Sequence, residues 1–322
     1  MSIDARRIPL SISKLRMLVI GSINRDVFLR LNRFPANDGS AEVEAVAEDL
    51  GGHGANCAVR AAHLGAQVSL MGAVGDDKSG SMLIEDLRRA RVDISRVHVD
   101  NSLPTGTVFI PQAPDRQFML MHRGANDSQT ASQDLPSKLI VGEFDVVVLM
   151  DPSHGLLNAL LRPLMDRDRT TLVWAPGGLW ASRPEFARSQ NIADTIILNR
   201  PEYDSALESS ECFPEQQCFP DVIVTAGSIG AYLHKRGARS LHVPAFAVDA
   251  VDATGAGDAF VAAYSAVAGL DFLTALERLQ VASMAGGLAT QARGARGGLC
   301  SVETILVHLE RALSKIKDTD SN

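Results

Sequence analysis

A run of small residues between two carboxylates carries the strongest chemical signal in the sequence. Residues 253–257 read ATGAG, Asp252 precedes them, and Asp258 leads into an unbroken apolar run. If a buried helix begins near Gly257, its first turn offers unpaired N–H donors and a partial positive charge that suit an anion. Asp258 beside that anion could accept a proton from a substrate hydroxyl, or it could merely cap the helix.

A second polar cluster lies near the N-terminus. Asn24 and Asp26 follow the first apolar run, and the stretch GGHGAN (51–56) opens a predicted helix. Carboxylate and amide groups can read the adjacent hydroxyls of a sugar, because Asp accepts two hydrogen bonds and Asn both donates and accepts. We therefore expect Asn24, Asp26 and Asn56 to form a polyol-reading set, with a helix cap as the alternative role for Asn56.

The phosphate-binding loops that are commonest in α/β enzymes are absent. No GxxxxGK[ST] occurs, and the chain contains no Gly-Lys pair. The stretch GAGDAF is not GxGxxG, because Phe260 occupies the last position, and GSINRD (21–26) fails as well. The sequence therefore disfavours a dinucleotide-binding Rossmann enzyme.

Composition excludes several classes of partner. The 322 residues carry a net charge of -7, so a general electrostatic grip on nucleic acid or anionic lipid is not expected. No apolar run reaches the roughly 18 residues of a membrane span, and residues 1–21 lack the apolar core of a signal peptide. These features predict a cytoplasmic protein that binds neither nucleic acid nor membranes.

Four cysteines are too few for a disulfide framework in a chain of this length. None forms a CxxC pair. Cys212 and Cys218 lie six residues apart in a proline-rich stretch and could close a small disulfide loop, but reduced thiols are the expected state.

Short apolar runs alternate with helical patterns along most of the chain. This alternation predicts an α/β fold with a doubly wound, mostly parallel sheet flanked by helices. The clearest helices are 55–66, 79–92 and 301–312. Strands are expected at 17–23, 67–75, 145–151, 170–176, 194–200 and 221–228.

Two stretches break this rhythm. Residues 38–50 and 104–122 show partial alternation, and the second has hairpin character around PQAPDR. We expect them to form a small β-lid outside the main sheet, with edge strands of that sheet as the alternative. The main domain then spans 16–312, and residues 1–15 and 313–322 are expected to be loose.

Five motifs, in order, resemble those of the ribokinase (PfkB) family of carbohydrate and nucleoside kinases. DATGAGDAF (252–260) resembles its D-T-x-G-A-G-D signature, and GGHGANCAVRAAHLGA (51–66) resembles its N-terminal signature. GSINRD resembles the first-strand motif, NRPE (199–202) matches N-x-x-E, and TAGSIG (225–230) resembles the nucleotide loop. The resemblance covers about residues 16–312.

The resemblance implies a transferase that moves the γ-phosphoryl group of ATP to a hydroxymethyl oxygen. By similarity Asp258 is the base, and the amides of Gly255, Ala256 and Gly257 hold the phosphoryl group. Such a transfer depends mainly on positioning and charge stabilisation. Asn199 and Glu202 are implied to organise Mg²⁺ through water, although Glu202 after Pro201 also suits a helix N-terminus. The implied nucleotide-binding residues are Asn199, Thr225, Gly227, Gly230, Gly257 and Ser283.

A monovalent cation, K⁺, is also implied. Its ligands in the family are mostly backbone carbonyls, so residue identity carries little information. Arg293 and Arg296 in the same loop could reach nucleotide phosphates or solvent. The matching positions are Asp252, Thr254, Ala289, Ala292, Gly294 and Gly298.

The acceptor site departs from the ribokinase pattern at three positions. His53 replaces Lys, Cys57 replaces Gln, and Asp151 replaces a sugar-binding Glu. The implied substrate-binding residues are Asn24, Asp26, Gly52, His53, Gly54, Asn56, Asp151 and Asp258.

Ribose or a similar free sugar is the expected acceptor, with a nucleoside as the alternative. A nucleoside base would need an apolar slab, which lid residues could supply, although these side chains equally suit core or dimer contacts. A phosphosugar kinase and a non-catalytic sugar-binding regulator rank lower. We expect a homodimer formed through the lid. The lid residues in question are Phe109, Phe118, Met119 and Met121.

Overall fold

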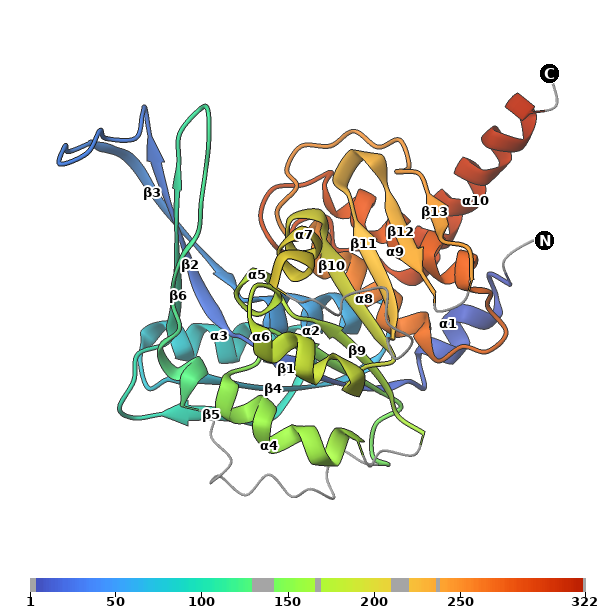
Figure 1. The fold of residues 1–322 in the computed structure, drawn as a ribbon, viewed down its shortest axis with the longest axis horizontal. Coiled ribbons are helices and arrows are strands. Elements are labelled where there is room, and N and C mark those ends of the chain that lie inside the picture. Colours follow the sequence, from blue (N-terminus) through green and yellow to red (C-terminus); the bar gives the residue numbers. More distant parts are fainter. Residues whose placement is uncertain (1–3, 129–141, 166–168, 210–219, 236–237, 321–322) are drawn as a thin grey trace.

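The main sheet is nine-stranded and mostly parallel, as predicted (Figure 1). The computed structural model describes residues 4–128, 142–165, 169–209, 220–235 and 238–320. Only the pairs β11–β12 and β12–β13 are antiparallel. In spatial order the strands are β13 (Leu241–Val243), β12 (Ala231–His234), β11 (Asp221–Thr225), β10 (Thr195–Asn199), β9 (Thr171–Ala175), β8 (Val146–Met150), β1 (Arg16–Gly21), β4 (Gln67–Gly75) and β5 (Asp93–Asp100).

Helices cover both faces of this sheet, and β1 shows why. Met17 and Val19 contribute to one hydrophobic core, whereas Leu18 and Ile20 contribute to the other. Successive side chains of a strand point to opposite faces, so a strand between two helical layers is apolar throughout. The first layer contains α1 (Arg7–Ile12), α2 (His53–His63), α3 (Lys78–Arg89), α8 (Ala256–Ala268), α9 (Ala275–Ala289) and α10 (Val302–Asp320). The second contains α4 (His154–Met165), α5 (Gly178–Ala181), α6 (Pro184–Ser189) and α7 (Arg200–Ser209).

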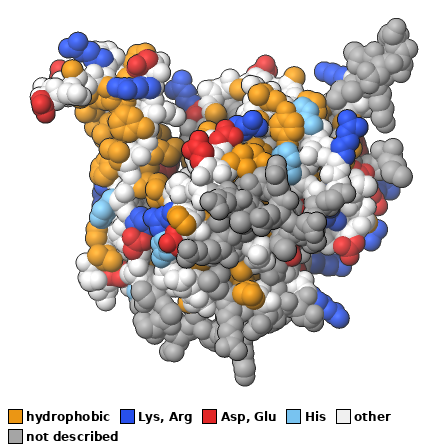
Figure 2. Space-filling model, in the orientation of Figure 1, with side chains coloured by type: hydrophobic (Ala, Val, Ile, Leu, Met, Phe, Trp, Pro, Cys, Tyr) orange, Lys and Arg blue, Asp and Glu red, His pale blue; other side chains and the backbone are white. Residues whose placement is uncertain are grey.

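A second, four-stranded sheet stands away from this body, and the surface is hollowed between the two (Figures 1 and 2). The β6–β7 hairpin falls where the sequence placed it. The sequence missed β2, which pairs in parallel with β6 and antiparallel with β3. We call this sheet the lid, and its order is β3 (Val43–Gly51), β2 (Asn24–Leu31), β6 (Gly106–Gln112) and β7 (Leu120–His122).

The ends of the chain are more ordered than expected. Residues 1–15 were expected to be loose, yet α1 buries Ile8 and Ile12, which are four residues apart and so share one helix face. This helix packs against α8 and α10. Residues 313–322 were also expected to be loose, but α10 continues to Asp320.

Two expectations from composition can be compared with the structure. In the described ranges, no helix combines the length and the apolar character needed to cross a bilayer. Cys57 and Cys300 are free thiols. Cys212 and Cys218 lie outside the described residues.

Candidate active site

The start of α8 is shaped by a glycine that no other residue could replace without strain. Gly255, the N-cap residue, has φ 77°, and a Cβ there would lie 2.2 Å from the carbonyl oxygen of Ala295. The helix therefore begins at Ala256, one residue before the predicted start. A Cβ on Gly257 would meet no heavy atom within 4 Å, so the first helical turn borders open space. The N–H of Ala256 donates to the carbonyl oxygen of Ala253 at 3.2 Å, and the N–H groups that follow it in this turn suit an anion.

Asp258 is buried and turned toward α2. The Nδ2 atom of Asn56 donates to Oδ2 of Asp258 at 2.9 Å, so the carboxylate is bound across two helices instead of merely capping its own. Burial raises the pKa of the Asp258 carboxyl, while His53, the Asn56 hydrogen bond and Arg60 oppose that rise. The acid and the amide that the sequence singled out in separate motifs are therefore direct partners.

Glycines bring α2 into this position. Gly52, its N-cap residue, has φ 92°, and a Cβ on Gly54 would lie 2.6 Å from the carbonyl carbon of Gly21. The first turn of α2 therefore rests directly on the carboxyl end of β1. His53 opens the helix with its side chain 46% exposed, and its Nδ1 lies 3.8 Å from Oδ2 of Asp151.

His53 is surrounded by acids. Partial removal from water alone would lower its pKa, but Asp258, Asp151, Glu202 and Asp26 together raise the pKa of His53 to about 9. The imidazole is therefore protonated at neutral pH. Protonated His53, which stands at the lysine position of the ribokinase pattern, therefore also places a positive charge in the site.

Asn24 and Asp26 both lie at the start of β2, where the chain leaves the main sheet for the lid. Burial raises the pKa of Asp26 to about 7; Asp49 and Asp258 add to the rise, and His53 and Arg296 oppose it. A buried acid with this pKa suits a ligand whose hydroxyl groups would stabilise its charged form.

Asn126 fixes the hinge between β1 and the lid. Its Oδ1 accepts from the N–H of Ile23 at 2.9 Å, and its Nδ2 donates to Oδ1 of Asn24 at 2.8 Å. Asn24 therefore uses its Oδ1 in a hydrogen bond within the protein, and its Nδ2 can donate to a ligand.

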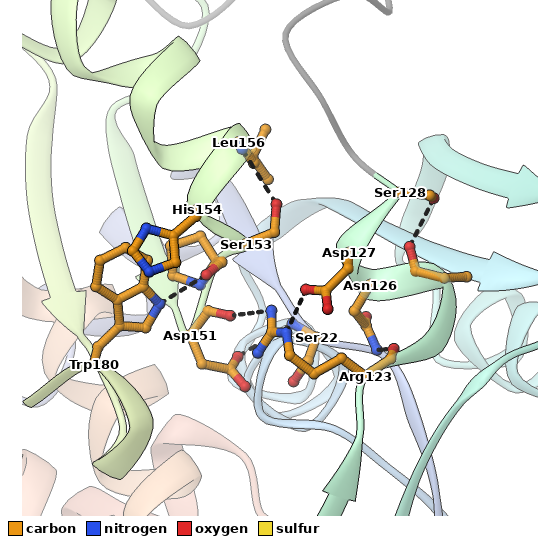
Figure 3. Close-up of polar contacts among 12 residues, drawn as sticks. Ser22, Arg123, Asn126, Asp127, Ser128, Asp151, Ser153, His154, Leu156 and Trp180 are labelled. Carbon is orange, nitrogen blue, oxygen red and sulfur yellow. Dashed lines mark hydrogen bonds and ion pairs between the residues drawn. The ribbon is translucent and has the colours of Figure 1, made fainter. Parts of the chain in front are cut away.

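Asp151 ends β8 in a strained conformation, with φ 43° (Figure 3). Its Oδ1 accepts from the N–H of Ser22 at 3.3 Å, and Arg123 donates to its carbonyl oxygen at 3.3 Å. Arg123 also pairs with Asp127. Burial raises the pKa of Asp151, against the opposing charges of His53 and Arg123. Arg123 thus helps to hold the backbone of Asp151, whose carboxylate lies near His53.

Asn199 and Glu202 form a reciprocal pair at the start of α7. The Glu202 N–H donates to Oδ1 of Asn199 at 2.8 Å, and the Asn199 N–H donates to Oε2 of Glu202 at 3.0 Å. Burial raises the pKa of Glu202, and the like charge of Asp258 adds to the rise against the Asn199 hydrogen bond and His53. The alternative role of Glu202 at a helix N-terminus is therefore realised.

Thr225 pairs with Asn199 in the β10–β11 register, so the two motifs lie side by side at one sheet edge. Gly227 follows in a short 3-10 helix, Gly227–Ile229, and a Cβ there would meet nothing within 4 Å. At Gly230, φ is 112°, and a Cβ would overlap the carbonyl oxygen of Val243. Ser283 lies apart on α9, half-buried, with no hydrogen-bond partner for its hydroxyl in the described structure.

Asp252 joins two loops that the sequence assigned to a monovalent cation. Its Oδ1 accepts from the N–H and Oγ1 of Thr254 at 2.9 and 2.7 Å, and its Oδ2 accepts from the N–H of Gly294 at 2.9 Å. Gly294 and Gly298 both adopt positive φ angles. Ala289 is the last residue of α9, and Ala292 lies in the segment that follows this helix. Across the described ranges, no cluster of three or more His, Cys, Asp or Glu side chains forms a metal site.

A model of the pfkB family carbohydrate kinases matches residues 14–301. The chain belongs to this family. The kinase is 30% identical over 286 residues to an ATP-dependent ribose-1-phosphate kinase of Halopiger xanaduensis, covering 87% of this chain and 94% of that one. It is 28% identical over 289 residues to the ribokinase of Bacillus subtilis, with the same coverage of 87% and 94%. The ribokinase-like resemblance seen in the motifs is confirmed.

Solved structures agree on the fold of the kinase. A Burkholderia thailandensis nucleoside kinase in complex with inosine superposes with a TM-score of 0.78 at 19% identity, covering 92% of this chain and 99% of that one. At this identity the likeness concerns the fold, which is the expected ribokinase-like sheet with a smaller second sheet.

The sequence did not indicate the hydrogen-bond partners of Arg296 in the kinase. Arg296 was expected to reach nucleotide phosphates or solvent, but its Nε donates to Oδ1 of Asn56 at 3.0 Å and its Nη1 pairs with Asp86. Arg293, by contrast, is exposed. The run RGARGG contains no signal that separates the two, because a loop has no periodicity from which to read burial.

The arginines around the acceptor side of the kinase are already paired with protein carboxylates. Besides Arg296 with Asp86 and Arg123 with Asp127, Arg25 lies 3.7 Å from Glu48. Acids, in contrast, cluster here. This balance disfavours a second anion on the acceptor and suits an uncharged, hydroxyl-rich molecule. The clustered acids are Asp26, Asp151, Glu202 and Asp258.

Proposed function

We propose that this kinase transfers the γ-phosphoryl group of ATP to a hydroxymethyl oxygen of a free sugar, ribose or a similar one. The observation that carries the proposal is the buried Asp258–Asn56 pair, which lies where the first turns of α8 and α2 meet. An anion-binding helix end and a proton acceptor then share one site. That is the arrangement phosphoryl transfer to an alcohol requires.

In the proposed reaction the acceptor oxygen forms a bond to the γ-phosphorus as the bond to the leaving ADP oxygen breaks. The hydroxyl proton passes to Oδ1 of Asp258, because the hydrogen bond from Asn56 occupies the other carboxylate oxygen, Oδ2. The amides of Gly255, Ala256 and Gly257 stabilise the charge on the transferred group. The open space beside Gly257 supports this role, because it gives the phosphoryl group access to the backbone.

The acceptor is proposed to bind among Asn24, Asp26, Asn56 and Asp151, with His53 and the backbone of Gly52 and Gly54 at its edge. A free sugar suits these side chains better than a phosphosugar, since Arg25, Arg123 and Arg296 are paired with carboxylates and Arg60 donates to backbone carbonyl groups. A nucleoside remains the alternative acceptor. Phe118, however, stacks on Phe34 at a centroid distance of 4.9 Å, which occupies one of the rings that could have faced a base.

ATP is proposed to lie along Thr225, Gly227, Gly230 and Ser283, continuing past Asn199 to Gly257. The ATP-dependent relative supports this co-substrate. Mg²⁺ fits beside Glu202, because burial raises the pKa of this carboxyl and a hydrated cation would stabilise its charged form. When bound, Mg²⁺ would neutralise negative charge that develops on the phosphate groups during transfer.

A monovalent cation, K⁺, is proposed between residues 252–254 and 289–298. The hydrogen bonds of Asp252 to Thr254 and Gly294 already hold these two segments together. Ala289, Ala292 and Gly298 would contribute through their carbonyl groups. A cation there would stiffen the loop directly before the α8 N-terminus.

We also propose a homodimer formed through the lid. The lid exposes apolar side chains on both outer strands, and they gather as one orange region of Figure 2. Burying such a surface against a second copy would stabilise the pair. Analytical ultracentrifugation of Leu120→Lys should show monomers where the wild type sediments as a dimer; a monomeric wild type would contradict the proposal. The exposed residues are Val43, Val46, Phe109, Phe118, Met119, Leu120 and Met121.

The acceptor is tested by ADP release from the purified protein with Mg²⁺, K⁺ and a panel of ribose, other pentoses, hexoses, nucleosides and phosphosugars. We expect the largest kcat/KM with a free sugar. Preference for a nucleoside would identify the alternative, and preference for a phosphosugar would contradict our reading of the arginines. Binding of sugar without acceptor-dependent ADP release would indicate a regulator.

A further inference from the structure

Arg296 lies outside the set of residues assigned to the proposed reaction, yet it contacts one of them. Its guanidinium lies between three elements: Nε donates to Asn56 on α2, Nη1 pairs with Asp86 on α3, and the charges of Asp49 and Asp26 on the lid strands act on it. The side chain is 13% exposed. Burial lowers the pKa of Arg296 to about 10 against these acids, so it stays charged at neutral pH.

The loop that carries Arg296 is itself held by α2. Arg60, four residues after Asn56, donates from Nη2 to the carbonyl oxygens of Ala295 at 2.8 Å and Gly297 at 3.0 Å. Arg60 is buried, so these bonds lie away from competing water. Helix α2 thus fixes the backbone on both sides of Arg296, and Arg296 in turn reaches back to α2.

The hydrogen bonds form a directed chain. Arg296 donates to Oδ1 of Asn56 at 3.0 Å, and Nδ2 of Asn56 donates to Oδ2 of Asp258 at 2.9 Å. An arginine has no acceptor, so Asn56 must present its oxygen to Arg296 and its NH₂ group to Asp258. This orientation holds Oδ2 of the acid and leaves Oδ1 for the acceptor hydroxyl.

We propose that Arg296 is a positioning residue for phosphoryl transfer, acting through Asn56 to set the orientation of Asp258. The proposal rests on the proposed function, because it assigns to Asp258 the role of base. Without Arg296, the Asn56 amide can rotate and Asp258 loses the donor that orients it. The effect belongs to turnover rather than to ATP binding, because Arg296 contacts Asn56, the hydrogen-bond partner of Asp258, and none of its hydrogen bonds or ion pairs in the described ranges reaches the nucleotide loop.

The test compares Arg296→Met with Arg89→Met. Arg89 is an exposed arginine on α3 whose ion-pair partner in the described ranges is Glu85 on the same helix. We expect kcat to fall about 10- to 100-fold in Arg296→Met with the KM for ATP unchanged, partial recovery in Arg296→Lys, and no change in Arg89→Met. In an Asn56→Ala background, adding Arg296→Met should cost less than twofold more. A fully active Arg296→Met, or a full additional loss in the Asn56→Ala background, would overturn the proposal.

Two further measurements keep the test decisive. If Arg296→Met does not fold, Asp86→Asn replaces it, with an expected loss of about threefold in kcat; unchanged turnover there would overturn the proposal.

If the wild type releases no ADP with any acceptor, the proposed function fails, but the hydrogen bond between Arg296 and Asn56 can still be tested. The Asn56 side-chain NH₂ resonances, assigned by their loss in Asn56→Ala, should shift in Arg296→Lys and not in Arg89→Met. Unshifted resonances would overturn the positioning role.

Discussion

The glycines of residues 51–54 and those of residues 255–258 lie at the starts of two helices in contact, α2 and α8, yet their surroundings differ. A Cβ on Gly51 would lie 2.0 Å from Oδ2 of Asp26, and one on Gly54 would strike the backbone of Gly21. Beside Gly257 there is nothing within 4 Å. The first motif makes room for the protein itself, whereas the second leaves room for something the protein binds.

The same contrast applies within the second motif. Gly255 is required by the fold, because its positive φ and its contact with Ala295 exclude a side chain. Gly257, two residues later, has no such constraint. Similar glycine-rich signatures therefore mix structural and ligand-facing positions, and only the neighbouring atoms distinguish them.

The largest effect is expected where the second motif ends. Asp258→Asn should lower turnover by about 10²–10⁴-fold, the usual contribution of a general base, since the amide cannot take the hydroxyl proton. Thermal unfolding should show no loss of stability, because an uncharged group replaces a buried acid. Steady-state ADP release and calorimetry on the same preparation check both points. Turnover near that of the wild type would remove Asp258 from the mechanism.

The next largest effect is expected in the pH dependence of stability, through Asp26. The carboxylate of Asp26 lies against Gly51 of the first motif. Its pKa is about 7 in the folded chain and about 3.9 in an unfolded one, so from pH 4 to 7 the folded state binds more protons. This group's contribution to the free energy of unfolding therefore falls as the pH rises through that window. Relative to the wild type, Asp26→Asn should gain on the order of 2–4 kcal/mol between pH 4 and pH 8 in urea titrations.

The matched control is Glu85→Gln, an exposed acid on α3. Its stability relative to the wild type should change little over the same pH range. A pH-independent difference between Asp26→Asn and the wild type would contradict the buried-acid assignment.

Gly54→Ala tests the structural role of the first motif. The new Cβ would overlap the backbone of Gly21, so we expect a loss of about 1–3 kcal/mol in the free energy of unfolding. Chemical denaturation measures this. An alanine variant as stable as the wild type would show that α2 can move away from β1 without cost.

Gly257→Ala tests the ligand-facing position of the second motif, and we expect it to have the smallest effect on stability. The added methyl group enters open space and helix propensity improves, so stability should stay equal or rise by about 0.5–1 kcal/mol. Turnover should nevertheless fall about tenfold, because the methyl group occupies the space where a phosphoryl group would approach the amides. Unchanged turnover would indicate that the anion does not bind at this turn.

The sequence determined six strands of the main sheet and the helices α2, α3, α8 and α10, but it did not indicate the strands β5, β12 and β13. Apolar runs such as 145–151 and 194–200 identify strands buried on both faces. A continuous apolar run can be recognised without knowing which elements pack against it. The family motifs identified Asp258, Asn56 and Asp26 for the same reason: each is a local string of residue types. The alternation in 104–122 likewise predicted the lid hairpin.

Only the tertiary structure decided how these residues act on one another. The lid strand β2 escaped notice because its burial pattern is irregular and one of its two partners, β6, lies far along the chain. The helix α1 depends on a groove formed by α8 and α10. Arg296 lies 240 residues from Asn56, and their hydrogen bond arises from folding alone. Contacts between distant segments depend on packing, and local residue patterns do not record packing.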